Sequence, residues 1–73
     1  MKIKALRWKK FDWGYYAMGV NQNYIIRAEN KHYRLTIMPH DYGRPILQDA
    51  KTVEECKKIA QIQHEESILR WFE

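Results

Sequence analysis

The sequence predicts an α+β domain in which an antiparallel β-meander of three or four strands packs one face against a single C-terminal α-helix. In the first half of the chain, apolar and polar residues alternate between turn-forming segments, as they do in half-buried strands. The last third instead opens with a helix cap and then contains no Pro or Gly. A chain of 73 residues is enough for one domain, and we expect a sheet over about 2–38, an irregular excursion over 39–51 and a helix over about 53–72.

Four segments of the first half are rich in the β-branched and aromatic residues that fit a pleated surface: IKALRWK, YYAMGV, YIIRAE and HYRLTIM. The turn signal Asp12-Trp13-Gly14 separates the first and second segments, and a polar stretch over 21–23 separates the second and third. The last two are joined by Asn30-Lys31, which we expect to form a two-residue hairpin turn because Asn tolerates a positive φ. A turn of this length fixes the register of the last two strands.

In that register, Arg27 lies directly opposite Arg34 on the face that points away from the helix. The face toward the helix carries three pairs of mostly apolar residues: Ala28 and Tyr33, Ile26 and Leu35, Tyr24 and Ile37. Like charges at facing positions disfavour a sheet by up to about 1 kcal/mol. Two interpretations stay open: the arginines point into water and are screened by Glu29 or Glu54, or their guanidinium groups together bind a phosphate or the carboxylates of a partner.

The first strand adds two further cations to this arrangement. If Leu6 and Trp8 point toward the core, Arg7 and Lys9 lie on the same face as the two arginines. We expect Trp8 to be buried, because a small sheet needs large rings to bury enough apolar area. The candidate residues for binding an anion, a nucleic acid or an acidic partner are therefore Arg7, Lys9, Arg27 and Arg34.

The facing of the second strand depends on the length of the polar loop that follows it. A two-residue loop directs Tyr15 and Ala17 toward the core and exposes Tyr16. A three-residue loop instead buries Tyr16, Met18 and Val20. We favour the three-residue loop, because it buries more apolar area.

A capping box predicts where the helix begins. The Thr52 hydroxyl can accept a hydrogen bond from the backbone N–H of Glu55, and the Glu55 carboxylate can accept one from the N–H of Thr52. At about 100° per residue, one side of the helix carries a row whose middle residues are small enough to let the helix lie close to the sheet. This row comprises Val53, Cys56, Ala60, His64, Ser67, Ile68 and Trp71.

A second apolar row, formed by Ile59, Ile62 and Leu69, falls on roughly the opposite side of the helix. One helix cannot direct both rows into a single thin core. We expect the excursion around Ile46 and Leu47 to tuck under the edge of the domain and cover the second row. The alternative is that the second row is a surface for a partner or for self-association.

The sequence contains none of the usual signatures of catalysis or metal binding. Cys56 and His64 lie about 12 Å apart along the helix axis at a rise of 1.5 Å per residue, which is too far for a shared zinc ion. We expect Cys56 to be a buried, unreactive thiol, and His64 to form a hydrogen bond at the margin of the helix face. The chain has no paired histidines at metalloprotease spacing, no Gly-rich phosphate loop and no nucleophile elbow. We therefore expect neither enzymatic activity nor a metal or cofactor.

Charge is distributed unevenly around a net value of +4. Residues 1–44 contain nine basic and three acidic residues, whereas the chain from Lys51 onward contains four basic and five acidic residues. Attraction of an anionic partner would therefore be directed to the first two thirds of the chain. A single cysteine, a charged start and no apolar run near the roughly 18 residues of a membrane span lead us to expect a cytoplasmic protein of a bacterial cell, with no membrane partner.

The order of these segments resembles a recurring type of short phage and prophage protein with a βββα or ββββα build. The resemblance is carried by the aromatic meander and by a helix with a Thr cap, paired glutamates, a His-Glu step and an Ile-Leu end. The helix residues that fit are Thr52, Glu54, Glu55, Ala60, Gln61, His64, Glu65, Ile68 and Leu69, whereas Cys56 stands where alanine is usual. The resemblance implies an origin in a mobile element and no catalytic residues, and it leaves the activity undefined.

The topology is also similar to the arm-type DNA-binding domains of phage integrases, whose open sheet face enters the major groove. This similarity implies that the four candidate cations would contact phosphates and guanine edges.

Three functions are consistent with these observations. The first is a non-enzymatic, phage-type accessory protein that docks onto a host defence or nucleic-acid-processing complex and modulates or inhibits it. The second is a DNA- or RNA-binding module that uses the basic open face of the sheet. The third is a small homo-oligomeric structural protein in which the helix rows of Ile59, Ile62 and Leu69 pair.

Overall fold

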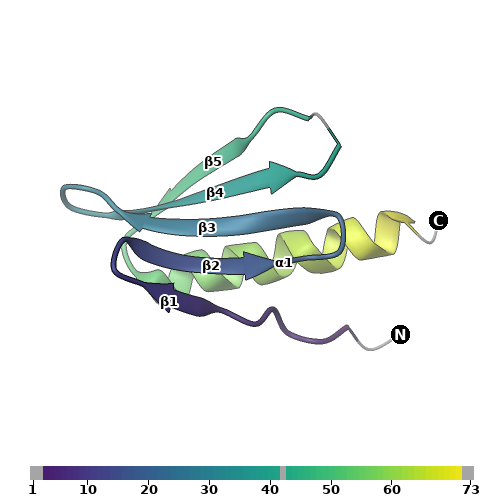
Figure 1. Cartoon of the computed structure of the whole chain (residues 1–73), viewed down its shortest axis with the longest axis horizontal. Helices are drawn as coiled ribbons and strands as arrows, with labels where there is room; N and C mark the ends of the chain where they lie inside the picture. Colours follow the sequence, from purple (N-terminus) through teal and green to yellow (C-terminus); the bar gives the residue numbers. More distant parts are fainter. Residues whose placement is uncertain (1–2, 42, 72–73) are drawn as a thin grey trace.

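A computed structural model describes residues 3–41 and 43–71 of the chain, with side chains up to residue 70. One antiparallel sheet of five strands in sequential order is followed by one helix (Figure 1). The elements are β1 (Lys9–Phe11), β2 (Gly14–Met18), β3 (Gln22–Ala28), β4 (Tyr33–Pro39), β5 (Ile46–Ala50) and α1 (Val53–Trp71). The predicted α+β meander with a C-terminal helix is confirmed, with five strands where the sequence indicated three or four.

The additional strand is β5, which occupies the second half of the predicted irregular excursion. It pairs with β4, so that Ile46 lies opposite Ile37 and Asp49 lies opposite Arg34. An irregular segment was expected because 39–51 contains Pro39, Gly43 and Pro45, but a proline directly before an edge strand removes no hydrogen bond from the ladder. Ile46 and Leu47 do not tuck under the domain edge as expected, because they belong to this edge strand and are exposed.

The first strand begins later than predicted. β1 contains only Lys9–Phe11, whereas residues 3–8 leave the sheet and approach α1. There the backbone N–H of Leu6 donates a hydrogen bond of 2.9 Å to the side-chain oxygen of Gln61. Leu6 is buried, and Trp8, which the sequence predicted to be buried, is half-buried and packs against the core.

The β3–β4 hairpin has the predicted register. Arg27 lies directly opposite Arg34, and the apolar pairs of the helix-facing side are those that the sequence indicated. The backbone N–H of Glu29 donates to the carbonyl oxygen of His32 at 2.8 Å and closes the turn. A positive φ at Asn30 was not needed, since no non-glycine residue within the described ranges has one.

The register of β2 against β3 is that of neither alternative considered. Met18 pairs with Asn23, which leaves four residues, 19–22, between the paired positions, although β3 already begins at Gln22. Because this number is even, the side chains of β2 point to the same faces of the sheet as they would with a two-residue loop, so the preference for a three-residue loop was wrong. Ala17 faces the core, while Met18 and Val20 are 68% and 66% exposed.

The core lies between the sheet and α1, which packs across β3, β4 and β5 and passes behind the sheet in Figure 1. Its buried apolar residues are Leu6, Ala17, Tyr24, Ile26, Leu35, Ile37, Cys56 and Ala60. Because Cys56 and Ala60 are small and fully buried, the helix lies close to the sheet, as its sequence indicated. His64 continues this row, but it meets the edge of the Tyr24 ring, with ring centroids 6.2 Å apart, instead of forming the expected hydrogen bond within the described residues.

The helix begins with the predicted cap in a modified form. The N–H of Glu55 donates to the Thr52 hydroxyl at 3.1 Å, whereas the Glu55 carboxylate accepts from the N–H of Lys51 at 3.4 Å rather than from that of Thr52.

Within the described ranges, no helix has the length and apolar character required to cross a membrane.

The second apolar row of α1 is divided. Ile59 packs against the core, whereas Ile62 and Leu69 are 54% and 49% exposed. The region expected to cover this row instead extends the sheet as β5, so the row is not covered in the predicted way.

Candidate binding surface on the open face of the sheet

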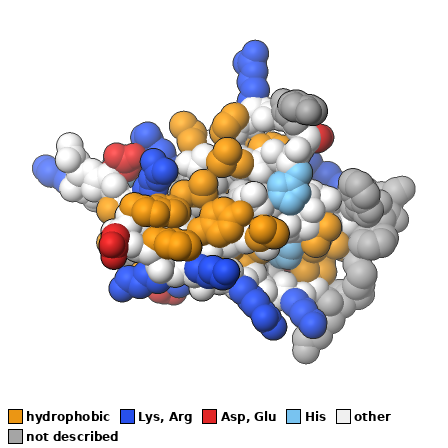
Figure 2. Space-filling view, in the orientation of Figure 1, with side chains coloured by type: hydrophobic (Ala, Val, Ile, Leu, Met, Phe, Trp, Pro, Cys, Tyr) orange, Lys and Arg blue, Asp and Glu red, His pale blue; other side chains and the backbone are white. Residues whose placement is uncertain are grey.

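The face of the sheet that points away from α1, here called the open face, is apolar in its middle. Directly paired residues of antiparallel strands share a face, so the pairing identifies its members. Two rows cross all five strands, and a third crosses β2, β3 and β4. The rows are Lys9, Tyr16, Ile25, Thr36 and Leu47; Phe11, Gly14, Arg27, Arg34 and Asp49; and Met18, Asn23 and Met38. Figure 2 shows hydrophobic side chains gathered over the middle of the sheet, with Lys and Arg side chains around them.

Large apolar side chains on this face are in contact with solvent. Met18, Met38 and Leu47 are among the exposed hydrophobic residues, and they come from β2, β4 and β5. In a half-buried sheet the outer face is ordinarily polar, with apolar residues alternating inward. The open face is therefore more apolar than packing within this fold requires.

An exposed cluster of two rings and one guanidinium group lies at the β1–β2 end of the open face. The rings of Phe11 and Trp13 are stacked, with centroids 5.2 Å apart and an interplanar angle of 4°. The guanidinium carbon of Arg27 lies 5.4 Å from the centroid of the Trp13 ring, within the range of a cation–π interaction. We call Phe11, Trp13 and Arg27 the aromatic-arginine cluster. No carboxylate among the described residues forms an ion pair with Arg27.

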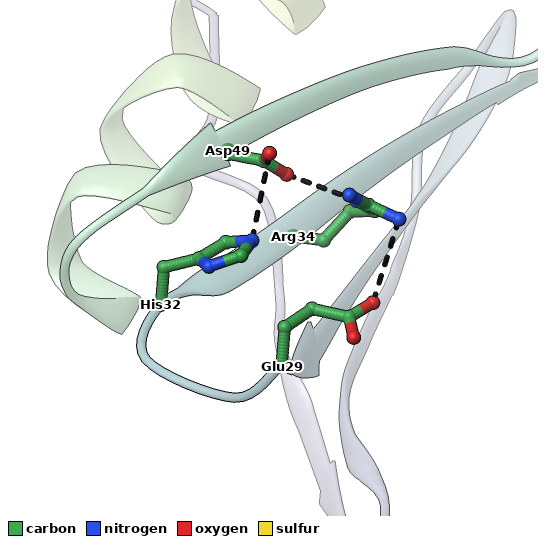
Figure 3. Close-up of polar contacts among 4 residues, drawn as sticks. All are labelled: Glu29, His32, Arg34 and Asp49. Carbon is green, nitrogen blue, oxygen red and sulfur yellow. Dashed lines mark hydrogen bonds and ion pairs between the residues drawn. The ribbon is translucent and has the colours of Figure 1, made fainter.

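Arg34, directly opposite Arg27, is held by carboxylates instead (Figure 3). Its Nε donates a hydrogen bond of 2.9 Å to Oδ1 of Asp49, and its Nη1 lies 3.6 Å from Oε1 of Glu29. The Asp49 Oδ2 lies 3.5 Å from Nε2 of His32. The hydrogen bond with Arg34 lowers the pKa of Asp49 and raises that of Arg34. The positive charge of Arg34 is therefore balanced within the chain.

The two facing arginines are thus not equivalent. Both line a hollow of about 340 Å³ in the open face, but Glu29 also lines it. Of the two screening glutamates that the sequence suggested, Glu29 pairs with Arg34, whereas Glu54 forms no ion pair with either arginine among the described residues. Asp49 is a partner that the sequence did not suggest, because the strand that carries it was not predicted. Of the facing pair, Arg27 is the cation that has no acidic partner within the described part of the chain.

The remaining two candidate cations lie on the β1 side. Lys9 is on the open face, opposite Tyr16. Arg7 precedes β1 and lines a separate groove, to which Lys9 also contributes. The structure therefore distributes the four predicted cations over two neighbouring places: Arg27 and Arg34 lie in the central hollow, and Arg7 and Lys9 lie beside the groove.

Sequence reasoning missed the aromatic-arginine cluster and the exposed apolar residues of β4 and β5. The signal for the cluster was Gly14, which has a φ of +149° and allows Phe11 and Gly14 to pair across the turn. The signal for Met38 was its place in the alternation of β4, where Leu35 and Ile37 point inward.

The described residues contain no group of three or more His, Cys, Asp or Glu side chains arranged to hold a metal ion. Cys56 is fully buried in the core, and burial raises the pKa of its thiol. His64 is almost fully buried, and burial lowers the pKa of its imidazole.

Comparison of the chain with protein-family models, with curated proteins and with solved structures found no significant match. The functional interpretation therefore rests on the geometry of the open face.

Proposed function

We propose that this chain is a non-enzymatic binding protein whose open face docks onto a protein that presents an apolar patch bordered by carboxylates. The observation that carries the proposal is the exposed apolar surface formed by Phe11, Trp13, Met18, Met38 and Leu47. Monomeric proteins seldom expose large contiguous apolar patches without a use for them, and aromatic, Met and Arg side chains are enriched at protein interfaces.

The charges beside this surface favour an acidic partner. Arg27 and Lys9 border the apolar middle at its β1–β2 end, and neither forms an ion pair within the described ranges. At the β5 end, Arg34 is neutralised by Asp49 and Glu29. Such a distribution suits a partner with carboxylates on one side of an apolar patch better than it suits a uniformly charged phosphate backbone.

The resemblance to short phage proteins supports a host complex as the partner, with defence and nucleic-acid-processing complexes as the proposed targets. On this proposal the chain modulates or inhibits its target by covering a surface of it, because it brings no catalytic group to the interface. The phage origin rests on the resemblance alone, whereas the docking surface rests on geometry.

Two matched double variants test the docking surface. Met38→Glu with Leu47→Glu places two charges on the open face, and Ile62→Glu with Leu69→Glu places two charges on the exposed row of α1. All four residues are exposed, so both variants should fold. Immobilised protein is used to capture partners from a bacterial lysate, and the purified partner is then titrated against each variant by calorimetry.

We expect the open-face variant to lose binding and the helix variant to retain it. The reverse result would show that the interface includes Ile62 and Leu69 and not the open face, and it would contradict the proposal. Analytical ultracentrifugation of both variants tests the homo-oligomer alternative, which requires the wild type to self-associate and the helix variant to be monomeric.

The aromatic-arginine cluster favours a second candidate function, direct binding of nucleic acid. Exposed rings beside a cation are the elements on which nucleic-acid bases stack, and stacking contributes about 1–3 kcal/mol per base. Fluorescence anisotropy with a labelled DNA duplex, an RNA hairpin and single-stranded DNA, at low and near-physiological salt, tests this candidate.

The two arginines provide an internal control for that experiment. Because Arg34 is already paired with carboxylates, Arg27→Glu should weaken nucleic-acid binding far more than Arg34→Glu does. Absence of binding by the wild-type protein even at low salt would eliminate this candidate.

A further inference from the structure

A groove of about 510 Å³ lies where the N-terminal segment leaves the sheet. β1 pairs with β2 only from Gly14 to Tyr16, so the last residues of β2, Ala17 and Met18, have no strand on that side. The preceding segment diverges toward α1, where Leu6 is bonded to Gln61. We call the space between this segment, the end of β2 and α1 the N-terminal groove.

The N-terminal groove combines an apolar lining with a cationic border. Leu6 and His64, which are both buried, contribute from the N-terminal segment and from α1, and the exposed side chains of Met18 and Val20 contribute from the opposite side. Three further lining residues are cations: Lys4, Arg7 and Lys9. Among the described residues no Asp or Glu lines the groove, in contrast to the central hollow, where Glu29 accompanies the arginines.

Gly19 keeps the inner end of this groove open to His64. A Cβ atom at this position would lie 2.6 Å from the carbonyl oxygen of Gln22 and 3.2 Å from Nδ1 of His64. Any side chain here would therefore displace the loop or the ring. The groove consequently ends on an aromatic ring that is almost fully buried among apolar residues.

We propose that the N-terminal groove binds a small amphiphile with an anionic head group, of the class of medium-chain carboxylates. Its volume falls within the roughly 300–1,000 Å³ typical of small-molecule sites, and such sites join a mostly apolar lining to a few polar groups. The apolar chain lies along Met18 and Val20, and the carboxylate lies at the border formed by the three cations. Arg7 is the residue whose planar group can form two parallel hydrogen bonds with a carboxylate.

This site shares Lys9, Tyr16 and Met18 with the open face but extends beyond the proposed docking surface. Lys4, Leu6, Val20 and His64 belong to the N-terminal segment, a loop and the helix, and none of them lies in the strand pairs of the open face. The two proposals can therefore fail independently, since variants of Val20 test the groove and variants of Leu47 test the open face.

The test compares two probes with the same apolar chain and opposite head groups, decanoate and decyltrimethylammonium, each below its micelle concentration. Methyl NMR spectra of the whole chain report where each probe binds. We expect decanoate to shift the methyl signals of Leu6, Met18 and Val20 in a saturable way and to leave those of Leu47 and Leu69 unchanged. The cationic probe should produce no saturable shift at the same methyl groups.

Variants establish which groups are responsible. Lys4→Glu with Arg7→Glu should weaken decanoate binding by about tenfold or more, because both charge-assisted contacts become repulsive. Val20→Glu should abolish binding, because it places a charge on the apolar wall of the groove, and the variant should still fold because Val20 is exposed. Lys58→Glu, on the exposed side of α1, is the matched control and should bind decanoate with affinity within about twofold of the wild type, since one distant exposed charge is largely screened by salt.

Three results would overturn the proposal. Equal binding of both probes would show that the cations do not select the head group. Shifts at Leu47 in place of Val20 would place the probe on the open face. Absence of any saturable shift with decanoate would show that the groove does not bind this class of ligand.

Discussion

Replacing Gly14 with alanine should remove most of the stability of the domain. Gly14 has a φ of +149°, which side-chain-bearing residues rarely adopt, and holding another residue there costs roughly 1–3 kcal/mol. The added Cβ would also overlap the carbonyl oxygen of Ile26 on β3 and lie 3.3 Å from Cα of Arg27. Moving β2 away from β3 to relieve such an overlap costs about 1–3 kcal/mol more, as overpacking does in a core. The sum of about 2–6 kcal/mol compares with a total of roughly 3–5 kcal/mol for a domain of this size.

Urea unfolding followed by circular dichroism and by tryptophan fluorescence measures this loss. Gly43→Ala is the matched control, because the nearest described atoms to a Cβ there are the Pro39 side chain at 3.1 Å and the Asp41 carbonyl oxygen at 3.3 Å, and Gly43 has no positive φ. We expect Gly43→Ala to cost less than about 1 kcal/mol. If Gly14→Ala unfolds at the same urea concentration as Gly43→Ala, the conformational restriction at Gly14 does not exist as described.

Two further predictions concern buried groups. The Cys56 thiol is fully buried, and burial raises its pKa. In the native protein it should therefore react with an aromatic disulfide reagent far more slowly than in urea, which absorbance of the released thiolate measures. Equally fast reaction under both conditions would mean that the thiol is accessible in the native protein. Burial lowers the pKa of His64 below its ordinary value of 6.5, an effect that outweighs the nearby Glu65 carboxylate, so the unfolded chain binds the proton more readily. The stability that the neutral imidazole contributes is therefore complete above about pH 6.5 and is lost as the pH falls from there toward the folded-state pKa. Over that range the urea midpoint should fall in the wild type and fall less in His64→Gln, while His40→Gln, at an exposed position, should behave like the wild type. Parallel profiles for all three proteins would contradict the assignment to His64.

The elements predicted well are those determined by local sequence. The β3–β4 register follows from one tight turn and from apolar alternation on both sides of it, and α1 follows from a cap and an uninterrupted row of small and apolar residues. In both cases the stabilising contacts lie within a short stretch of chain. Sequence spacing alone is then sufficient.

β5 could not be predicted from local sequence, because it forms a strand only through pairing with β4. Its five residues show no clear alternation of exposed and buried side chains, and Pro45 precedes them. The strand exists through its pairing with β4, which is a tertiary contact. The acidic partner Asp49 was missed for the same reason, so the sequence showed two facing arginines without the carboxylate that neutralises one of them.

The different environments of Arg27 and Arg34 follow from their position in one row of the sheet. The neighbour of Arg34 in that row is Asp49, whose carboxylate accepts its hydrogen bond. The neighbour of Arg27 is Gly14, which has no side chain, so the guanidinium group extends over Trp13. The open face therefore has a positive end at β1 and β2 and a balanced end at β5. A partner bound across this face should direct its carboxylates toward Arg27, and charge reversal at Arg27 should weaken its binding more than charge reversal at Arg34.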